Sequence, residues 1–129
     1  MEFNLEPGIT GEHRLVVTKD KCANRDYIRE DIWVFSTPDM IRSMEFACIK
    51  AVLPHLPDGW RTVGTVVDVK HLKATLLGKE VVACGELVKM EGRKLWFNVE
   101  AHDEEGLIGK GEHGRYIINV DDFASILKE

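Results

Sequence analysis

No stretch of this 129-residue sequence stays apolar over the roughly 20 residues that a membrane-spanning helix requires. The N-terminal segment MEFNLEPGITGEH is acidic and lacks the apolar region of a signal peptide. Runs of basic residues are also missing, and the formal net charge of −5 argues against broad nucleic-acid binding. We therefore expect a protein with no membrane and no nucleic-acid partner.

Cysteine is scarce, and the sequence contains none of the common cysteine motifs. Cys22, Cys48 and Cys84 are odd in number and form no CxxC pair, which argues against a disulfide framework and favours a reducing compartment. The five histidines show no metal-ligand spacing, and neither a GxSxG elbow nor a phosphate-cradling glycine loop is present. These absences predict a cytoplasmic protein that uses no metal and no redox cofactor.

The length suits one core, so residues 1–129 are expected to form a single domain. Hydrophobic periodicity and turn signals predict a strand within 8–18, a polar loop over 19–31, a helix over about 37–53, strands over 61–75, 80–90, 94–103 and 107–120, and a short terminal helix over 121–129 capped by Asp121 or Asp122. Short turns favour antiparallel neighbours. The expected fold is therefore α+β, with a curved antiparallel sheet of about five strands around one long helix.

The predicted helix, VFSTPDMIRSMEFACIKAVLP, has an acidic residue on its apolar side. Thr37 can cap this helix, Pro38 suits its first turn and Pro54 can end it. At 100° per residue, Glu45 falls within the apolar arc. An ionised carboxylate buried without a partner is costly or has a raised pKa. Glu45 is thus either an acid that reaches water at the edge of the arc or one that needs a basic partner, a cavity or a subunit interface.

His71 and Thr37 also combine reactive chemistry with structural positions. By alternation, His71 continues the apolar face of Val63, Val67 and Val69. It is either a hydrogen-bonded core histidine or a base at the open end of that face. Thr37 is either a plain helix cap or a hydroxyl beside helix N–H groups that can hold a developing oxyanion.

Arg115 lies in the last predicted strand, LIGKGEHGRYIINV, whose glycines permit close backbone approach. It is either a surface arginine or a group that binds a phosphate or carboxylate. The neighbouring His113 gives a weaker signal of function than Arg115.

The chain resembles the hotdog-fold thioesterases, and most closely the fluoroacetyl-CoA thioesterase type, from about residue 8 to residue 120. The resemblance rests on the helix segment quoted above and on the stretches VGTVVDVKHLKATLLGKEV and MEGRKLWFNVEAHDEEGLIGKGEHGR. It implies that Thr37, Glu45 and His71 form the active site, and that Gly64 and Arg115 correspond to substrate-binding positions. It also implies a homodimer with two sites at the subunit interface.

The implied reaction is hydrolysis of a small or medium acyl-CoA, with CoA as part of the substrate. Glu45 would attack the thioester or activate water, and His71 would act as general base or acid. The fluoroacetyl enzyme uses loop phenylalanines to favour its fluorinated substrate, whereas the corresponding positions here are Ile28 and Asp31. The loop over 19–33 is accordingly expected to be a mobile lid.

Two other functional classes remain open at the level of sequence. One is an acyl-CoA hydratase or dehydratase, which usually needs a His/Asp pair on a shared loop, and no such compact motif is evident. The other is a non-catalytic acyl-CoA binding protein, which would keep the pocket without needing a Thr/Glu/His set.

Overall fold

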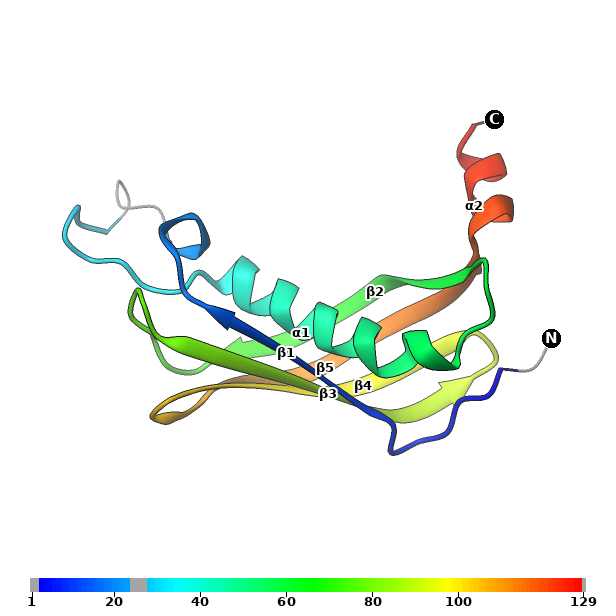
Figure 1. Cartoon of the computed structure of the whole chain (residues 1–129), viewed down its shortest axis with the longest axis horizontal. Helices are drawn as coiled ribbons and strands as arrows, with labels where there is room; N and C mark the ends of the chain where they lie inside the picture. Colours follow the sequence, from blue (N-terminus) through cyan, green and yellow to red (C-terminus); the bar gives the residue numbers. More distant parts are fainter. Residues whose placement is uncertain (1–2, 24–27, 129) are drawn as a thin grey trace.

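The computed structural model describes residues 3–23 and 28–128. Its elements are β1 (Thr10–Val16), a 3-10 turn (Lys19–Lys21), α1 (Thr37–Val52), a second 3-10 turn (Leu53–His55), β2 (Trp60–His71), β3 (Glu80–Glu91), β4 (Lys94–Asp103), β5 (Gly106–Asn119) and α2 (Val120–Leu127). The strands form one antiparallel sheet in the order β1-β3-β4-β5-β2, and α1 lies across one face of it (Figure 1). The predicted α+β architecture, with five strands and one long helix, is confirmed.

The core lies between α1 and the sheet, where two apolar periodicities meet. Alternate residues of β4 are buried, namely Leu95, Phe97, Val99 and Ala101. The helix contributes Met40, Met44, Ala47, Cys48, Ala51 and Val52. Gly11 allows α1 to pack closely on β1, because a Cβ at this position would lie 2.2 Å from the Ala47 carbonyl oxygen. The sequence patterns of period 2 and period 3.6 therefore build this core directly.

Both helices begin close to the predicted residues, but their caps differ from the prediction. Ser36, not Thr37, caps α1: its backbone is extended and its hydroxyl accepts a hydrogen bond from the Asp39 N–H at 3.2 Å. Thr37 is instead the first helical residue, so its hydroxyl is available for another contact. Asn119 caps α2 by accepting from the Asp122 N–H at 3.1 Å, in place of Asp121 or Asp122.

Strand β2 forms one free edge of the sheet and contains a bulge that changes the predicted alternation. Gly64 pairs with Arg115 and Val66 pairs with Gly114, so Thr65 is an extra residue between them. Because a bulge reverses the side-chain parity, Val63 pairs with the exposed Tyr116, on the sheet face away from α1. The predicted common face of Val63, Val67 and His71 is therefore wrong for Val63. The bulge places Gly64 on the α1 side instead.

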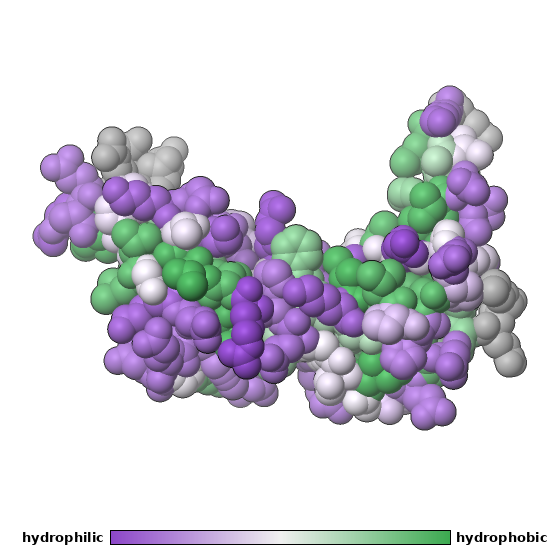
Figure 2. All heavy atoms as spheres, viewed as in Figure 1, coloured by the Kyte–Doolittle hydropathy of each residue, from purple (hydrophilic) through white to green (hydrophobic). Residues whose placement is uncertain are grey.

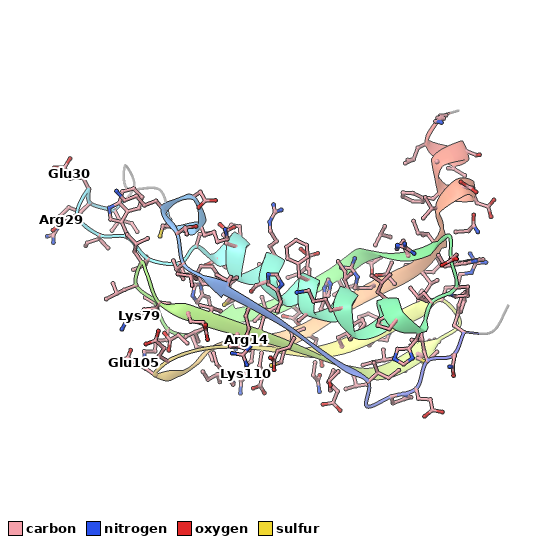
Figure 3. The ribbon with its side chains drawn as sticks, in the orientation of Figure 1. Arg14, Arg29, Glu30, Lys79, Glu105 and Lys110 are labelled. Atoms are coloured by element: carbon pink, nitrogen blue, oxygen red, sulfur yellow. The ribbon has the colours of Figure 1, made fainter. Side chains whose placement is uncertain are left out.

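Charged side chains labelled in Figure 3, among them Arg29, Glu30 and Lys110, point away from the helix–sheet core. Within the described ranges, no helix is both long and apolar enough to cross a membrane. All three cysteines are free thiols, and burial raises the pKa of Cys48 to about 12. Residues 24–27 of the predicted lid lie outside the described residues, whereas Ile28 is exposed on the segment that leads to α1.

Candidate active site

The first candidate centre joins the N-terminus of α1 to the last residue of β2. The Thr37 hydroxyl and His71 Nδ1 are 2.8 Å apart and form a hydrogen bond. Both residues line an open cleft of about 330 Å³, together with Ala23, Val34, Phe35, Ser36, Leu72, Lys73 and Ala74. The residues alone left a structural or a reactive role open for each, and the resemblance implied one shared active site; the fold brings the two side chains into contact.

The environment of His71 favours its neutral form. Burial lowers the pKa of this imidazole, and the Lys73 backbone only partly offsets that effect. Its Nε2 atom is shielded from solvent and has no hydrogen-bond partner among the described residues. A neutral imidazole holds one proton and one lone pair, so His71 can exchange a proton with the Thr37 hydroxyl or with a bound reactant.

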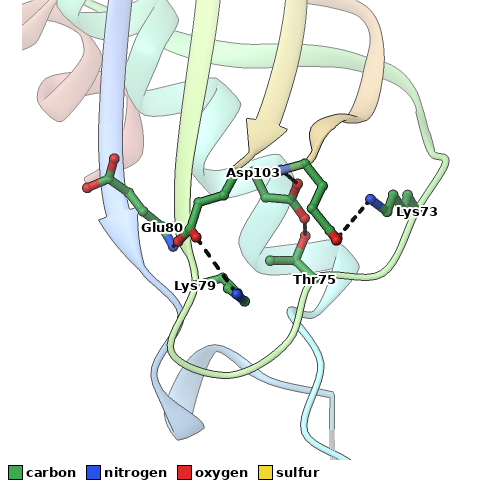
Figure 4. A network of polar contacts seen from close by, with 7 residues as sticks. Lys73, Thr75, Lys79, Glu80 and Asp103 are labelled. Atoms are coloured by element: carbon green, nitrogen blue, oxygen red, sulfur yellow. Dashed lines mark hydrogen bonds and ion pairs between the residues drawn. The ribbon is translucent and has the colours of Figure 1, made fainter.

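A polar network fixes the segment between β2 and β3 that follows His71 (Figure 4). The buried Thr75 hydroxyl donates to Asp103 at 2.8 Å, and Asp103 also accepts from the Glu105 N–H at 2.8 Å. The Thr75 carbonyl in turn accepts from the Phe35 N–H at 2.8 Å, just before α1. One residue of this segment therefore holds the start of α1 beside the end of β2, which keeps Thr37 and His71 together.

The second candidate centre surrounds Glu45 in the middle of α1. A Glu45 carboxylate oxygen lies 3.7 Å from the Arg115 guanidinium and 4.0 Å from His113 Nε2. Arg115 and His113 are buried, whereas the Glu45 side chain is 35% exposed. Of the alternatives that the sequence left open for Glu45, a basic partner is therefore present, and solvent or a ligand can still reach the carboxylate.

Arg115 is held in place by hydrogen bonds to neighbouring groups on β2 and β5. It donates to the Thr62 hydroxyl at 2.8 Å and to the Thr62 carbonyl at 3.0 Å. A third bond, 3.0 Å long, joins it to His113 Nε2. Because His113 Nδ1 lies 2.7 Å from the Val66 carbonyl, Nδ1 carries the proton and Nε2 accepts from Arg115. Burial lowers the pKa of His113, which keeps this imidazole neutral beside the cation.

Gly64 lies directly under this second centre. A Cβ at this position would approach the Glu45 carboxylate to 3.0 Å and both Arg115 and His113 to 3.4 Å. The bulge at Thr65 turns this residue towards α1, as described above. The absent side chain therefore leaves room for the carboxylate, so Gly64 shapes the Glu45 centre; the substrate-binding role that the resemblance implies for it stays a prediction.

Within one chain the two centres are separate. Thr37 and Glu45 are eight residues apart on α1, which corresponds to about 12 Å along the helix axis. Glu45 interacts with β5, whereas Thr37 interacts with the end of β2. The structure thus brings together Thr37 with His71, and Glu45 with Gly64 and Arg115, but not all five residues.

Sequence reasoning underestimated His113 and missed Thr62. His113 was ranked below Arg115, although the fold buries it between Val66 and Arg115 and close to Glu45. The signal that could have found it is its spacing of two from Arg115, which places both side chains on one face of a strand. Thr62 had no comparable signal, because its partner Arg115 is 53 residues away in the sequence. Among the residues described, no cluster of three His, Cys, Asp or Glu side chains is arranged to hold a metal ion.

Comparison with known proteins places this chain in one family. Residues 17–121 match the family described as fluoroacetyl-CoA-specific thioesterase. A fluoroacetyl-CoA thioesterase of Streptantibioticus cattleyicolor is 38% identical over 96 residues, covering 74% of this chain and 69% of that protein. A solved structure of a fluoroacetyl-CoA thioesterase has a TM-score of 0.87 at 33% identity, covering 97% of this chain and 96% of that one.

A hypothetical protein of Thermus thermophilus, described as a thioesterase superfamily member, also has a TM-score of 0.87. It is 28% identical and covers 95% of this chain and 90% of its own. The family match spans α1, β2 and β5. It therefore includes the five residues that the sequence analysis predicted as site residues. The chain therefore belongs to the fluoroacetyl-CoA-specific thioesterase family, whose members share the hotdog fold.

Proposed function

We propose that this protein hydrolyses a small or medium acyl-CoA thioester to the free acid and CoA. The observation that carries the proposal is the Thr37–His71 hydrogen bond at a helix N-terminus in an open cleft. A reactive carboxylate, Glu45, lies on the same helix. Membership of a thioesterase family gives this arrangement its reaction class. Thiols that are all free, with none in a disulfide, support a cytoplasmic location.

The N-terminus of α1 offers a small set of donors for the thioester oxygen. Ser36 N–H donates to the Lys21 carbonyl, Pro38 has no N–H, and Asp39 N–H donates to the Ser36 hydroxyl. Among the described groups of this first turn, the Thr37 N–H therefore remains to face a substrate, and the Thr37 hydroxyl can donate to it when the hydroxyl oxygen accepts from a proton on His71 Nδ1. In the proposed mechanism they stabilise the negative charge that develops on the carbonyl oxygen, aided by the helix dipole.

Glu45 supplies the nucleophilic carboxylate or activates a water molecule, and His71 transfers the proton. In the direct route, Glu45 removes a proton from water, the hydroxide adds to the carbonyl carbon, and the C–S bond breaks. The CoA thiolate leaves and takes up a proton that His71 receives from the newly protonated Glu45 and passes on, which restores the neutral imidazole and the carboxylate. In the covalent route, Glu45 itself adds to the carbonyl carbon, the C–S bond breaks and the CoA thiolate leaves and is protonated. Water then hydrolyses the resulting anhydride, which releases the acid and restores Glu45.

We infer that a homodimer completes the site, because one chain keeps Glu45 about 12 Å along the helix from Thr37. The free edge β2 supports this arrangement. Val67 lies on the α1 side of β2 yet is 48% exposed, and neighbouring Val66 is exposed as well. Antiparallel pairing of β2 with a second copy would cover this apolar edge. It would also bring the Glu45 centre of one copy towards the Thr37–His71 centre of the other.

Mixed dimers test both the reaction and the shared site. Glu45→Gln and Thr37→Ala proteins are each assayed for release of free thiol from acetyl-, butyryl- and hexanoyl-CoA, then unfolded and refolded together in equal amounts. If each site takes Glu45 from one copy and Thr37 from the other, half of the dimers contain one intact site, and about a quarter of parental activity returns. No recovery in a mixture proven to contain mixed dimers would assign both residues to one chain. Absence of thiol release by the parent protein would overturn the thioesterase proposal itself.

A further inference from the structure

The terminal helix α2 exposes an apolar side that no described residue of the same copy covers. It is eight residues long, and none of them is buried. Ile126 and Leu127 are 66% and 68% exposed, and Val120 and Phe123 are also exposed. An isolated helix of two turns is only marginally stable in water, so packing of its apolar side must supply the stability. This helix therefore requires a covering surface.

A second exposed apolar surface lies at the opposite end of the molecule, just after β2. It consists of Leu72, which is 50% exposed and lines the Thr37–His71 cleft, and of Leu76 and Leu77. Figure 2 shows hydrophobic side chains gathered towards both ends of the molecule, with those of α2 at one end. The two surfaces are far apart within one chain and cannot cover each other.

The free strand β2 connects these two surfaces. Asn119, the cap of α2, pairs with Trp60 at the start of β2, whereas Leu72 follows the last residue of the same strand. In an antiparallel pair of β2 strands, the start of one strand lies beside the end of the other. Neighbouring strands are about 4.8 Å apart, so the β5 strand that leads into α2 would lie about 10 Å from the partner's β2.

The direction of α2 agrees with such a contact. Figure 1 shows α2 rising from the end of β5 on the same side of the sheet as α1. Its eight residues span about 12 Å, which is enough to reach across the edge strands. The apolar side of α2 and the apolar surface around Leu72 would then meet on the face of the sheet that carries the cleft.

We infer that α2 of each copy packs on the Leu72–Leu76–Leu77 surface of the other copy and forms the outer wall of its Thr37–His71 cleft. The occupant of this surface is thus a second copy of the chain, and its terminal helix contacts the acyl group. This inference rests on the dimer and the reaction proposed above. Acyl-chain length would be set in part by Ile126 and Leu127, which lie outside the Thr37, Glu45 and His71 centres.

Substrate chain length provides the first test. The double variant Ile126→Ser and Leu127→Ser is compared with the parent in kcat/KM for acetyl-CoA and hexanoyl-CoA. Loss of contact with about two methylene groups should lower the hexanoyl value about tenfold, while the acetyl value changes little. Val88→Ser, at another exposed apolar position, on β3, serves as the control and should leave the ratio unchanged. An unchanged ratio in the double variant would overturn the inferred role in acyl binding.

Cross-linking provides a second test that needs no activity. Cysteines are introduced at Ile126 and Leu72 in a chain whose Cys22 and Cys84 are replaced by serine, and a bis-maleimide of about 10 Å span is added. A covalent two-chain species is expected for this pair and not for the pair Ile126→Cys with Val88→Cys. If the protein is dimeric but no two-chain species forms, the inferred packing is wrong. If cross-linking succeeds while the parent hydrolyses no acyl-CoA, only the proposed function fails.

Discussion

Replacing Glu45 by glutamine separates its role in chemistry from its role in stability. The substitution keeps the size of the side chain, removes its charge and leaves the hydrogen bonds from Arg115 to Thr62 and His113 in place. If Glu45 is the nucleophile or base, turnover should fall by at least 10²-fold, and by up to about 10⁴-fold. The protein should nevertheless remain folded.

The expected loss of stability follows from the geometry of the Glu45–Arg115 pair. At 3.7 Å, two unit charges interact by about 4 kcal/mol at an effective dielectric constant of 20. The Glu45 side chain is 35% exposed, so solvent screens much of this energy and the carboxylate also loses hydration when it pairs. Since Arg115 keeps its three hydrogen bonds, we expect a net loss of about 1–2 kcal/mol in the free energy of unfolding.

Thiol release and thermal unfolding are measured on the same preparations. Glu86→Gln is the matched control, because it makes the same charge change on the sheet face away from α1. A loss of 1–2 kcal/mol corresponds to a fall in Tm of roughly 3–10 °C for a domain of this size. A Glu45→Gln protein that hydrolyses acyl-CoA at the parental rate would refute the catalytic role. A variant that fails to fold would refute the expectation that the hydrogen bonds of Arg115 to Thr62 and His113 are enough to hold this buried cation without the carboxylate.

Four further predictions address the remaining residues. Gly64→Ala should displace the Glu45 carboxylate by a few tenths of an ångström, because the new Cβ would lie 3.0 Å from it. This shift should lower kcat about tenfold with little change in Tm. An unaltered kcat would show that the space at Gly64 does not position the carboxylate. Burial lowers the pKa of His71, so the acid limb of the pH profile of kcat/KM should lie below pH 6.5. His71→Ala should abolish that limb and reduce turnover by about 10²–10⁴-fold. If the limb survives in the variant, it belongs to another group. The unfolded chain binds that proton first as pH falls, so His71 should also cause stability to decline as pH decreases from about 6.5 towards its folded-state pKa, which urea unfolding of parent and His71→Ala can measure. Ser36→Ala should cost about 1 kcal/mol of stability while sparing turnover, whereas Thr37→Ala should raise the activation barrier by up to roughly 3 kcal/mol; the reverse result would restore Thr37 as the cap.

The amino-acid sequence by itself determined the elements and the core of this protein. Alternation in the sequence of β4 places Leu95, Phe97, Val99 and Ala101 on one face of the strand, which is the face that the fold buries, and the helical period placed the apolar side of α1. The turn glycines Gly78, Gly92 and Gly106 adopt positive φ at the predicted breaks between strands. These features follow from local sequence because they depend on side-chain periodicity and backbone freedom over a few residues.

Only the tertiary structure decided how the functional side chains are grouped. The bulge at Thr65 reverses the alternation of β2, turns Gly64 towards Glu45 and moves Val63 to the other face. Nothing in the local sequence specifies this extra residue, because a bulge depends on the register between β2 and a strand some 50 residues further along the chain. The pairing of Thr37 with His71, and of Glu45 with Arg115, likewise joins residues 34 and 70 positions apart. Such contacts arise from packing a helix on a sheet, so the residue types could be predicted from sequence, whereas their division between two centres could not.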